Sequence, residues 1–168
     1  KIGIDDHSFC ENTPKLMALT GDDLGNMPKR PSHSNKGTFG KLLVIAGSYN
    51  MAGAAVLSAT AAYKSGAGLV KVITPEENRT IIQSSVPEAL LDTYDNIENG
   101  LDWASAIVIG PGIGKGKEAH DIVKYVLKEA GVPMLIDADA LNIISEDMDI
   151  LKNHKAPVIV TPHPGEMS

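Results

Sequence analysis

Short, largely apolar runs recur along the chain from about residue 40 onward and are separated by longer stretches with helical spacing. The runs have strand length, and their continuous apolar character is typical of parallel strands that are buried on both faces of a sheet. We predict an additional short edge strand at residues 89–91. The main strands are predicted at residues 42–46, 69–73, 106–109, 133–136 and 157–161.

Helix-forming stretches lie between these strands. Residues 52–64 favour helix, and we expect the side carrying Ala54, Leu57 and Ala61 to pack closely on the sheet. A second helix ends at Gly131. Its apolar face comprises Ile122, Val123, Val126, Leu127 and Ala130. Strands therefore alternate with helices, which predicts an α/β fold with a mostly parallel sheet and helices on both faces.

The first part of the chain has a different character. Residues 1–27 are polar and mixed, and we predict a linker there, followed by the α/β domain at residues 28–168. His7 and His33 lack partners at metal-ligand spacing, so we interpret both as solvated loop residues.

Charge and composition remove several classes of function. The net charge of −6 at pH 7 is unlike the basic surface of a nucleic-acid-binding protein. No apolar run reaches the roughly 18 residues that a membrane-spanning helix needs. Cys10 is the only cysteine and cannot form an intramolecular disulfide, so we predict a cytoplasmic protein.

The candidate chemistry lies in the loops that follow the predicted strands. In open α/β sheets, ligands bind beyond the carboxyl ends of the strands, so these loops should face one crevice. Residues 47–53 and 110–116 are rich in glycine, and residues 47–53 have the spacing of neither a phosphate loop nor a dinucleotide-binding fingerprint. Close approach of a ligand and simple tight packing both remain explanations for these glycines.

Three polar residues stand out in the segments that follow the predicted strands. Asp137 directly follows a buried strand and needs a partner, which could be a hydrated Mg²⁺, a ribose hydroxyl or a structural hydrogen bond. Asp139 could cap the next helix. His163 lies between two prolines that restrict its backbone, which favours a functional role. No nucleophile, base and acid can be assembled into a catalytic set.

Taken together, six motifs resemble one family, the ADP-dependent NAD(P)H-hydrate dehydratases. The resemblance covers about residues 28–168. The motifs are Lys-Gly-Thr-Phe-Gly at 36–40, Ala-Gly-Ser at 46–48 with Ala-Gly-Ala-Ala at 52–55, Ser-Gly-Ala-Gly-Leu-Val at 65–70, Gly-Pro-Gly-Ile-Gly at 110–114, Asp-Ala-Asp-Ala-Leu-Asn at 137–142 and Thr-Pro-His-Pro-Gly-Glu at 161–166.

The resemblance implies a ribokinase-like fold and a repair reaction. Family members restore hydrated NADH or NADPH by removing the hydroxyl while ADP, their co-substrate, is cleaved to AMP and phosphate with the assistance of Mg²⁺. The substrate-binding residues implied by the family are Ala54, Gly112, Gly114 and His163. The polar residues implied to line the same crevice are Asp137, Asp139, Asn142 and Glu166.

The chain also departs from the family pattern. Members continue to a Lys-Gly-x-x-Thr stretch and to a Gly-Ser-Gly-Asp motif whose aspartate is the catalytic base, and these residues contain neither. We therefore expect a domain truncated on its C-terminal side, with no catalytic residue and no metal ligand of its own, that is inactive alone. Ile-Gly-Ile at 2–4 resembles the tail of an NAD(P)H-hydrate epimerase domain, which implies a bifunctional parent. The family also implies a homo-oligomer.

Two other interpretations remain open. A ribokinase-like kinase of a vitamin precursor would share the sheet and the crevice. A nucleotide-binding fragment without activity would follow from the missing base. The residues present decide neither between NADH and NADPH hydrate nor between ADP and ATP.

Overall fold

The chain divides into two units, Lys1–Ser34 and Asn35–Ser168, and the fold is that of the second unit. The computed structural model describes residues 20, 21, 25 and 31–166. Cys10, His7, the residues 2–4 motif and most of the predicted linker lie outside the described residues. No helix among the residues described has both the length and the apolar character needed to cross a membrane.

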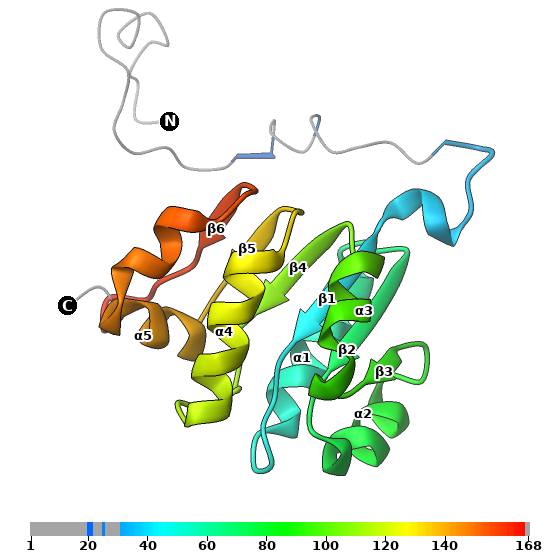
Figure 1. Cartoon of the computed structure of the whole chain (residues 1–168). Coiled ribbons are helices and arrows are strands. Elements are labelled where there is room, and N and C mark those ends of the chain that lie inside the picture. Colours follow the sequence, from blue (N-terminus) through cyan, green and yellow to red (C-terminus); the bar gives the residue numbers. More distant parts are fainter. Residues whose placement is uncertain (1–19, 22–24, 26–30, 167–168) are drawn as a thin grey trace, which may run out of the picture. The chain divides into compact units, whose positions relative to one another are not determined.

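The described part of the second unit is built on a six-stranded sheet in the order β3-β2-β1-β4-β5-β6 (Figure 1). Every neighbouring pair is parallel. The five main strands and the short edge strand expected from the apolar runs are confirmed. Their bounds are β1 (Lys41–Ile45), β2 (Leu69–Ile73), β3 (Leu90–Asp92), β4 (Ala106–Ile109), β5 (Met134–Ile136) and β6 (Val158–Val160).

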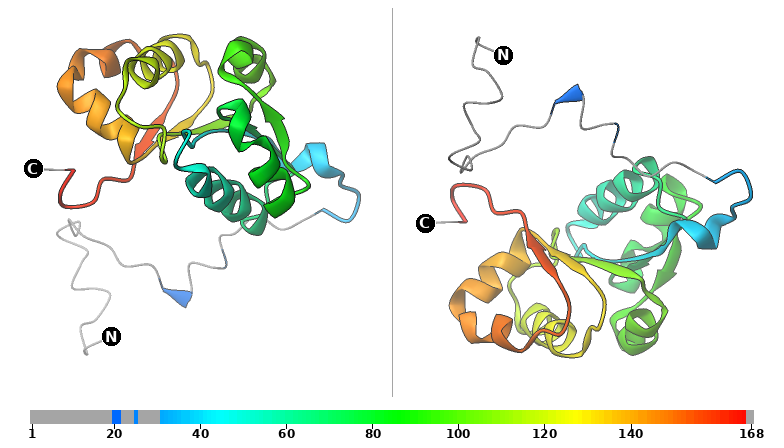
Figure 2. Two further views of the ribbon diagram at one scale, coloured as in Figure 1. Left: turned by 90° about the horizontal axis from the view of Figure 1, so that it is seen from below. Right: turned by 90° about the horizontal axis from the view of Figure 1, so that it is seen from above.

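Helices cover both faces of this sheet, as predicted (Figure 2). The α-helices are α1 (Ala52–Lys64), α2 (Arg79–Ser85), α3 (Ile97–Trp103), α4 (Lys117–Glu129) and α5 (Asp139–Glu146). Short 3₁₀ helices are η3 (Lys36–Phe39), η4 (Glu76–Asn78), η5 (Tyr94–Asn96) and η6 (Met148–Asn153).

Strand β1 contributes to two separate cores because successive side chains of a strand point to opposite faces. Leu43 and Ile45 pack with α3, α4 and α5 on one face. Val44 packs with α1 and α2 on the other face. Both faces of the central strand are therefore buried, which explains its continuous apolar sequence.

The packed face of α1 differs from the one expected. The helix has the predicted bounds, but Leu57 is 72% exposed. The buried residues are Ala52, Ala55, Ala59 and Ala62. Side chains on nearly all sides of this helix are apolar or small, so the spacing of apolar residues does not identify the packed face. The side that packs on the sheet is the one on which only alanine methyl groups project.

Candidate functional site

The loops that follow β1, β4, β5 and β6 all lie at the carboxyl edge of the sheet, because the strands are parallel. The first two loops are joined directly, since the Gly47 amide donates to the Pro111 carbonyl at 2.8 Å. Two of the loops that the sequence places beside one crevice, those after β1 and β4, are thus in contact.

The second glycine loop passes very close to its neighbours. A Cβ on Gly112 would lie 2.7 Å from the Ala54 Cβ, so the loop after β4 contacts the first turn of α1 at these two candidate residues. A Cβ on Gly110 would lie 1.8 Å from the Asp137 carbonyl oxygen. Packing therefore explains the glycines at 110 and 112.

Gly114 is different, because a Cβ there would meet nothing within 4 Å. Its backbone φ of +79° lies in the left-handed region that favours glycine. The Gly114 amide donates to Asp139 Oδ2 at 2.9 Å, which fixes the loop while leaving space beside it. Open space next to a fixed backbone is the arrangement expected where a ligand approaches the main chain.

The predicted capping role of Asp139 is wrong. Asp139 is the first residue of α5, its side chain accepts from the loop after β4, and the N-cap position belongs to Ala138, which makes no side-chain cap. Ala138 has φ +53°, an unfavourable conformation for a residue other than glycine. The Asn142 side chain donates to the Ala138 carbonyl at 3.2 Å and supports this turn.

Asp137 has a structural partner, one of the three alternatives left open by its sequence position. The Thr161 hydroxyl donates to Asp137 Oδ1 at 2.8 Å and links the ends of β5 and β6. The carboxylate is half-buried and lines a groove. Within the described residues, no group of three or more His, Cys, Asp or Glu side chains could hold a metal ion.

His163 and Glu166 form a pair on the loop after β6. One Glu166 oxygen accepts the His163 amide at 2.9 Å, and the other lies 3.1 Å from His163 Nε2. The Gly165 amide donates to Nδ1 at 3.0 Å, so the neutral ring carries its proton on Nε2 and donates it to Glu166. The imidazole is 68% exposed, whereas the Glu166 side chain is 8% exposed. A buried carboxylate thus holds an exposed imidazole.

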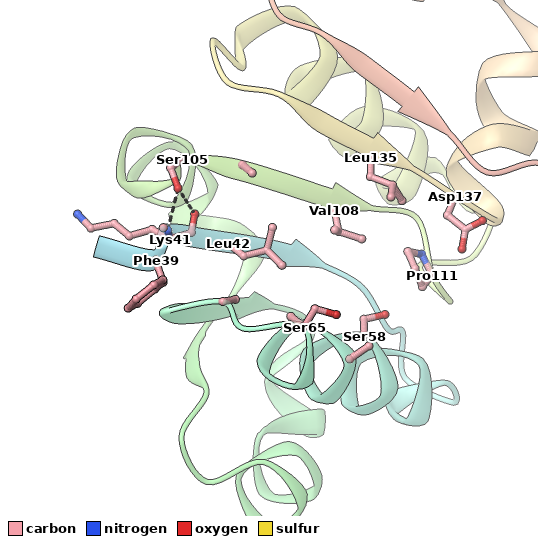
Figure 3. Close-up of a pocket in the computed structure, with 15 residues that line it drawn as sticks. Phe39, Lys41, Leu42, Ser58, Ser65, Ser105, Val108, Pro111, Leu135 and Asp137 are labelled. Carbon is pink, nitrogen blue, oxygen red and sulfur yellow. Dashed lines mark hydrogen bonds between the residues drawn. The ribbon is translucent and has the colours of Figure 1, made fainter. Parts of the chain in front are cut away.

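A groove of about 550 Å³ runs between α1 and the sheet, and no pattern in the sequence predicts it. Leu42, Val108 and Leu135 lie along its sheet side, and Ser58 and Ser65 along its helix side (Figure 3). Asp137 and Pro111 lie at the end nearest the loops described above. Beyond the groove, Ile159 of β6 is 63% exposed. The residues that line the groove include members of α1, β1, β4 and β5.

Three side chains that support the first glycine loop were not predicted from the sequence. Asn78 donates to the Ser48 carbonyl at 3.1 Å and to Thr74 Oγ1 at 2.9 Å. The Tyr94 hydroxyl donates to the Gly47 carbonyl at 3.1 Å. No motif marks Asn78 or Tyr94, because their partners follow a different strand.

Comparison with protein families and curated proteins gives a consistent result. The family model described as NAD(P)H-hydrate dehydratase matches residues 42–168. The bifunctional NAD(P)H-hydrate repair enzyme Nnr of Escherichia coli is 38% identical and is matched over 98% of this chain and 32% of the enzyme. The ADP-dependent (S)-NAD(P)H-hydrate dehydratase of Lactiplantibacillus plantarum is 39% identical, over 80% of this chain and 50% of the dehydratase.

Solved structures share the same arrangement. A ribokinase-like superfamily protein from Enterococcus faecalis has a TM-score of 0.80 at 33% identity, covering 88% of this chain and 54% of that protein. The ADP/ATP-dependent NAD(P)H-hydrate dehydratase from Bacillus subtilis, co-crystallized with ATP/Mg²⁺, has a TM-score of 0.69 at 34% identity, covering 84% and 50% respectively. The chain spans about half the length of these dehydratases.

Proposed function

The chain belongs to the NAD(P)H-hydrate dehydratase family, and we propose that the protein containing it repairs hydrated NADH or NADPH. The resemblance and the ribokinase-like fold expected from the six motifs are confirmed. The observation that carries the proposal is the contact between Ala54 in the first turn of α1 and Gly112 in the loop after β4, with open space beside Gly114. These are three of the residues implied to bind the substrate.

In the proposed reaction, hydrated NADH and ADP give NADH, AMP and phosphate. Transfer of the terminal phosphoryl group of ADP to the ring hydroxyl turns that hydroxyl into a leaving group. The ring nitrogen then supplies the electron pair that expels phosphate, and loss of a proton from the adjacent ring carbon restores the double bond of NADH. The work of the protein in such a reaction is to position two ligands and to neutralise phosphate charge.

Within this scheme, the residues of this chain bind and orient the hydrated cofactor. Gly112 packs against the small side chain of Ala54, and the open space beside the Gly114 backbone allows the dihydronicotinamide ring to approach closely. The Glu166 carboxylate holds the His163 ring in one orientation, so His163 can contact the substrate without first being ordered.

ADP as co-substrate and Mg²⁺ are part of the same proposal. Mg²⁺ in proteins is commonly held by one or two carboxylates together with substrate phosphates, where it neutralises phosphate charge. Asp137 offers one carboxylate, oriented by Thr161 and lining the groove, and would hold a hydrated Mg²⁺ in that mode. Co-crystallization of the Bacillus subtilis dehydratase with ATP/Mg²⁺ supports this choice of ligands.

We further propose that the parent protein is bifunctional, cytoplasmic and homo-oligomeric, with an NAD(P)H-hydrate epimerase domain. The bifunctional repair enzymes among the relatives support the epimerase partner. The catalytic base would come from a Gly-Ser-Gly-Asp motif, which is not among these 168 residues.

The test is a coupled assay of the complete polypeptide with hydrated NADH, ADP and Mg²⁺. We expect NADH to appear in a one-to-one ratio with AMP. A phosphorylated vitamin precursor formed from ATP, with no recovery of NADH, would instead assign the protein to the small-molecule kinases. Binding of nucleotide without any turnover would assign it to the inactive nucleotide-binding proteins.

A further inference from the structure

Two buried polar side chains hold the turn after β1. Asn78 is 1% exposed and Thr74 is 3% exposed. Burial of an amide and a hydroxyl is costly unless both are hydrogen-bonded, and here the Asn78 amide satisfies the Thr74 hydroxyl and the Ser48 carbonyl together. The segment that follows β2 and contains η4 therefore fixes the loop that follows β1.

Tyr94 holds the same turn from η5, the short helix after β3. Its ring packs against the core, and its hydroxyl donates to the Gly47 carbonyl at 3.1 Å. Burial, and to a lesser extent the negative charge of Glu118, raises the pKa of Tyr94 well above its ordinary value, so the hydroxyl remains a donor at all physiological pH values.

The turn passes this support to the candidate site through the backbone. The Ser48 carbonyl that accepts from Asn78 also accepts from the Met51 amide at 2.9 Å. The Met51 carbonyl in turn accepts the Ala54 amide at 3.2 Å. On the other side, Gly47 donates to Pro111, which precedes Gly112. The start of α1 at Ala54 and the loop at Gly112 are thus both tied to the turn at Gly47 and Ser48, whose carbonyls accept from Tyr94 and Asn78.

We propose that Asn78 and Tyr94 are positioning residues that set the distance between Ala54 in the first turn of α1 and Gly112 in the loop after β4 for the hydrated cofactor. The proposal rests on the proposed function, because the substrate is the one assigned there. Neither residue needs to touch the substrate. Misplacement of a binding surface by about 1 Å is enough to impair a reaction that depends on the alignment of two ligands.

The decisive variant is Tyr94→Phe, which removes one hydroxyl and keeps the ring. Tyr63→Phe is a matched control, since the Tyr63 hydroxyl also donates to a backbone carbonyl, that of Glu88, at 2.8 Å. Glu88 precedes β3, so this bond lies at the opposite edge of the sheet. We expect Tyr94→Phe to raise the KM for hydrated NADH about two- to tenfold, the usual range for one lost hydrogen bond, with the KM for ADP unchanged.

A second measurement does not depend on activity. We expect amide hydrogen exchange of residues 46–55 to be faster in Tyr94→Phe and in Asn78→Ala than in wild type, and unchanged in Tyr63→Phe. If the wild-type protein lacks dehydratase activity, the proposed function fails while this exchange measurement still decides whether the two residues hold the turn. If Asn78→Ala does not fold, Tyr94→Phe decides alone.

The proposal is overturned if Tyr94→Phe matches wild type in both exchange and KM. It is also overturned if the KM values for hydrated NADH and ADP rise together with a fall in Tm, because that pattern describes a general loss of stability.

Discussion

Gly110 is required by two separate constraints at one residue. Its φ of +125° lies where side chains are strained. A Cβ there would also lie 1.8 Å from the Asp137 carbonyl oxygen, which is backbone and cannot turn away. The approach of the loop after β4 to the loop after β5 thus depends on the absence of one methyl group.

We predict that Gly110→Ala destabilises the protein by about 2–5 kcal/mol, from strain and overpacking together. Gly116→Ala is the matched control, because Gly116 has φ −76° and a Cβ there would meet nothing within 4 Å. We expect the control to lie within about 1 kcal/mol of wild type. Urea unfolding measures both. Equal midpoints for the two variants would contradict this prediction.

The charge of Asp137 can be separated from its hydrogen bond. Asp137→Asn keeps an acceptor for the Thr161 hydroxyl and removes the charge, whereas Thr161→Val does the reverse. If Asp137 holds hydrated Mg²⁺, we predict that only Asp137→Asn raises the Mg²⁺ concentration for half-maximal dehydratase activity, by at least severalfold. An unchanged Mg²⁺ dependence with a higher KM for the nucleotide would favour a ribose hydroxyl as the partner.

At the scale of elements, α1 shows that a sequence can predict the bounds of a helix correctly and its packed face incorrectly. Ala59 is fully buried against the sheet, while Leu57 projects into solvent. We predict that Ala59→Leu destabilises the protein by about 1–3 kcal/mol through overpacking, or a fall in Tm of several degrees. Leu57→Ala should change stability by less than about 0.5 kcal/mol. Thermal unfolding of both variants tests which face of α1 is packed. A larger loss of stability in Leu57→Ala than in Ala59→Leu would contradict the prediction.

Helices α4 and α5 are joined by His120. Its Nδ1 lies 3.1 Å from the Gly116 carbonyl and its Nε2 lies 3.1 Å from Glu146 Oε2. The bond to Gly116 and then the Glu146 carboxylate raise the pKa of His120 in the folded state. The folded state therefore binds the proton more tightly than the unfolded chain. The resulting stabilisation is complete below the unfolded pKa of about 6.5 and is lost as pH rises through the raised pKa.

We predict that the pKa of His120, followed by NMR of its ring proton, falls toward its ordinary value in Glu146→Gln. The unfolding midpoint of the wild type should decrease as pH rises through the folded pKa, and His120→Gln should remove that component. A His120 pKa that does not respond to Glu146→Gln would show that this pair does not set the proton affinity.

For the whole molecule, the groove beside β4 and β5 and the exposed Ile159 of β6 mark surface that the described part of the chain leaves uncovered. The chain also spans only about half the length of the dehydratases that it matches. We predict that these 168 residues, with a mass of 17.7 kDa, give no turnover under conditions in which the complete polypeptide converts hydrated NADH. The coupled assay compares the two directly. Turnover by the 17.7 kDa chain would place the catalytic base among these residues.

The sequence by itself determined the strands, the bounds of α1 and the edge of the sheet where the candidate loops lie. These features depend on local patterns: continuous apolar runs, helical spacing and glycine stops act between residues near one another in the chain. The six motifs also sufficed for the family, because their order along the chain is itself specific.

Only the tertiary structure decided the packed face of α1, the partner of Asp139 and the support of the Gly47 turn. Asp139 bonds to a residue 25 positions away, Asn78 to one 30 positions away and Tyr94 to one 47 positions away. Such partners meet only after the strands take the order β3-β2-β1-β4-β5-β6. A polar residue has many possible hydrogen-bond partners along the sequence. The order of the strands in the sheet decides which of them comes within bonding distance.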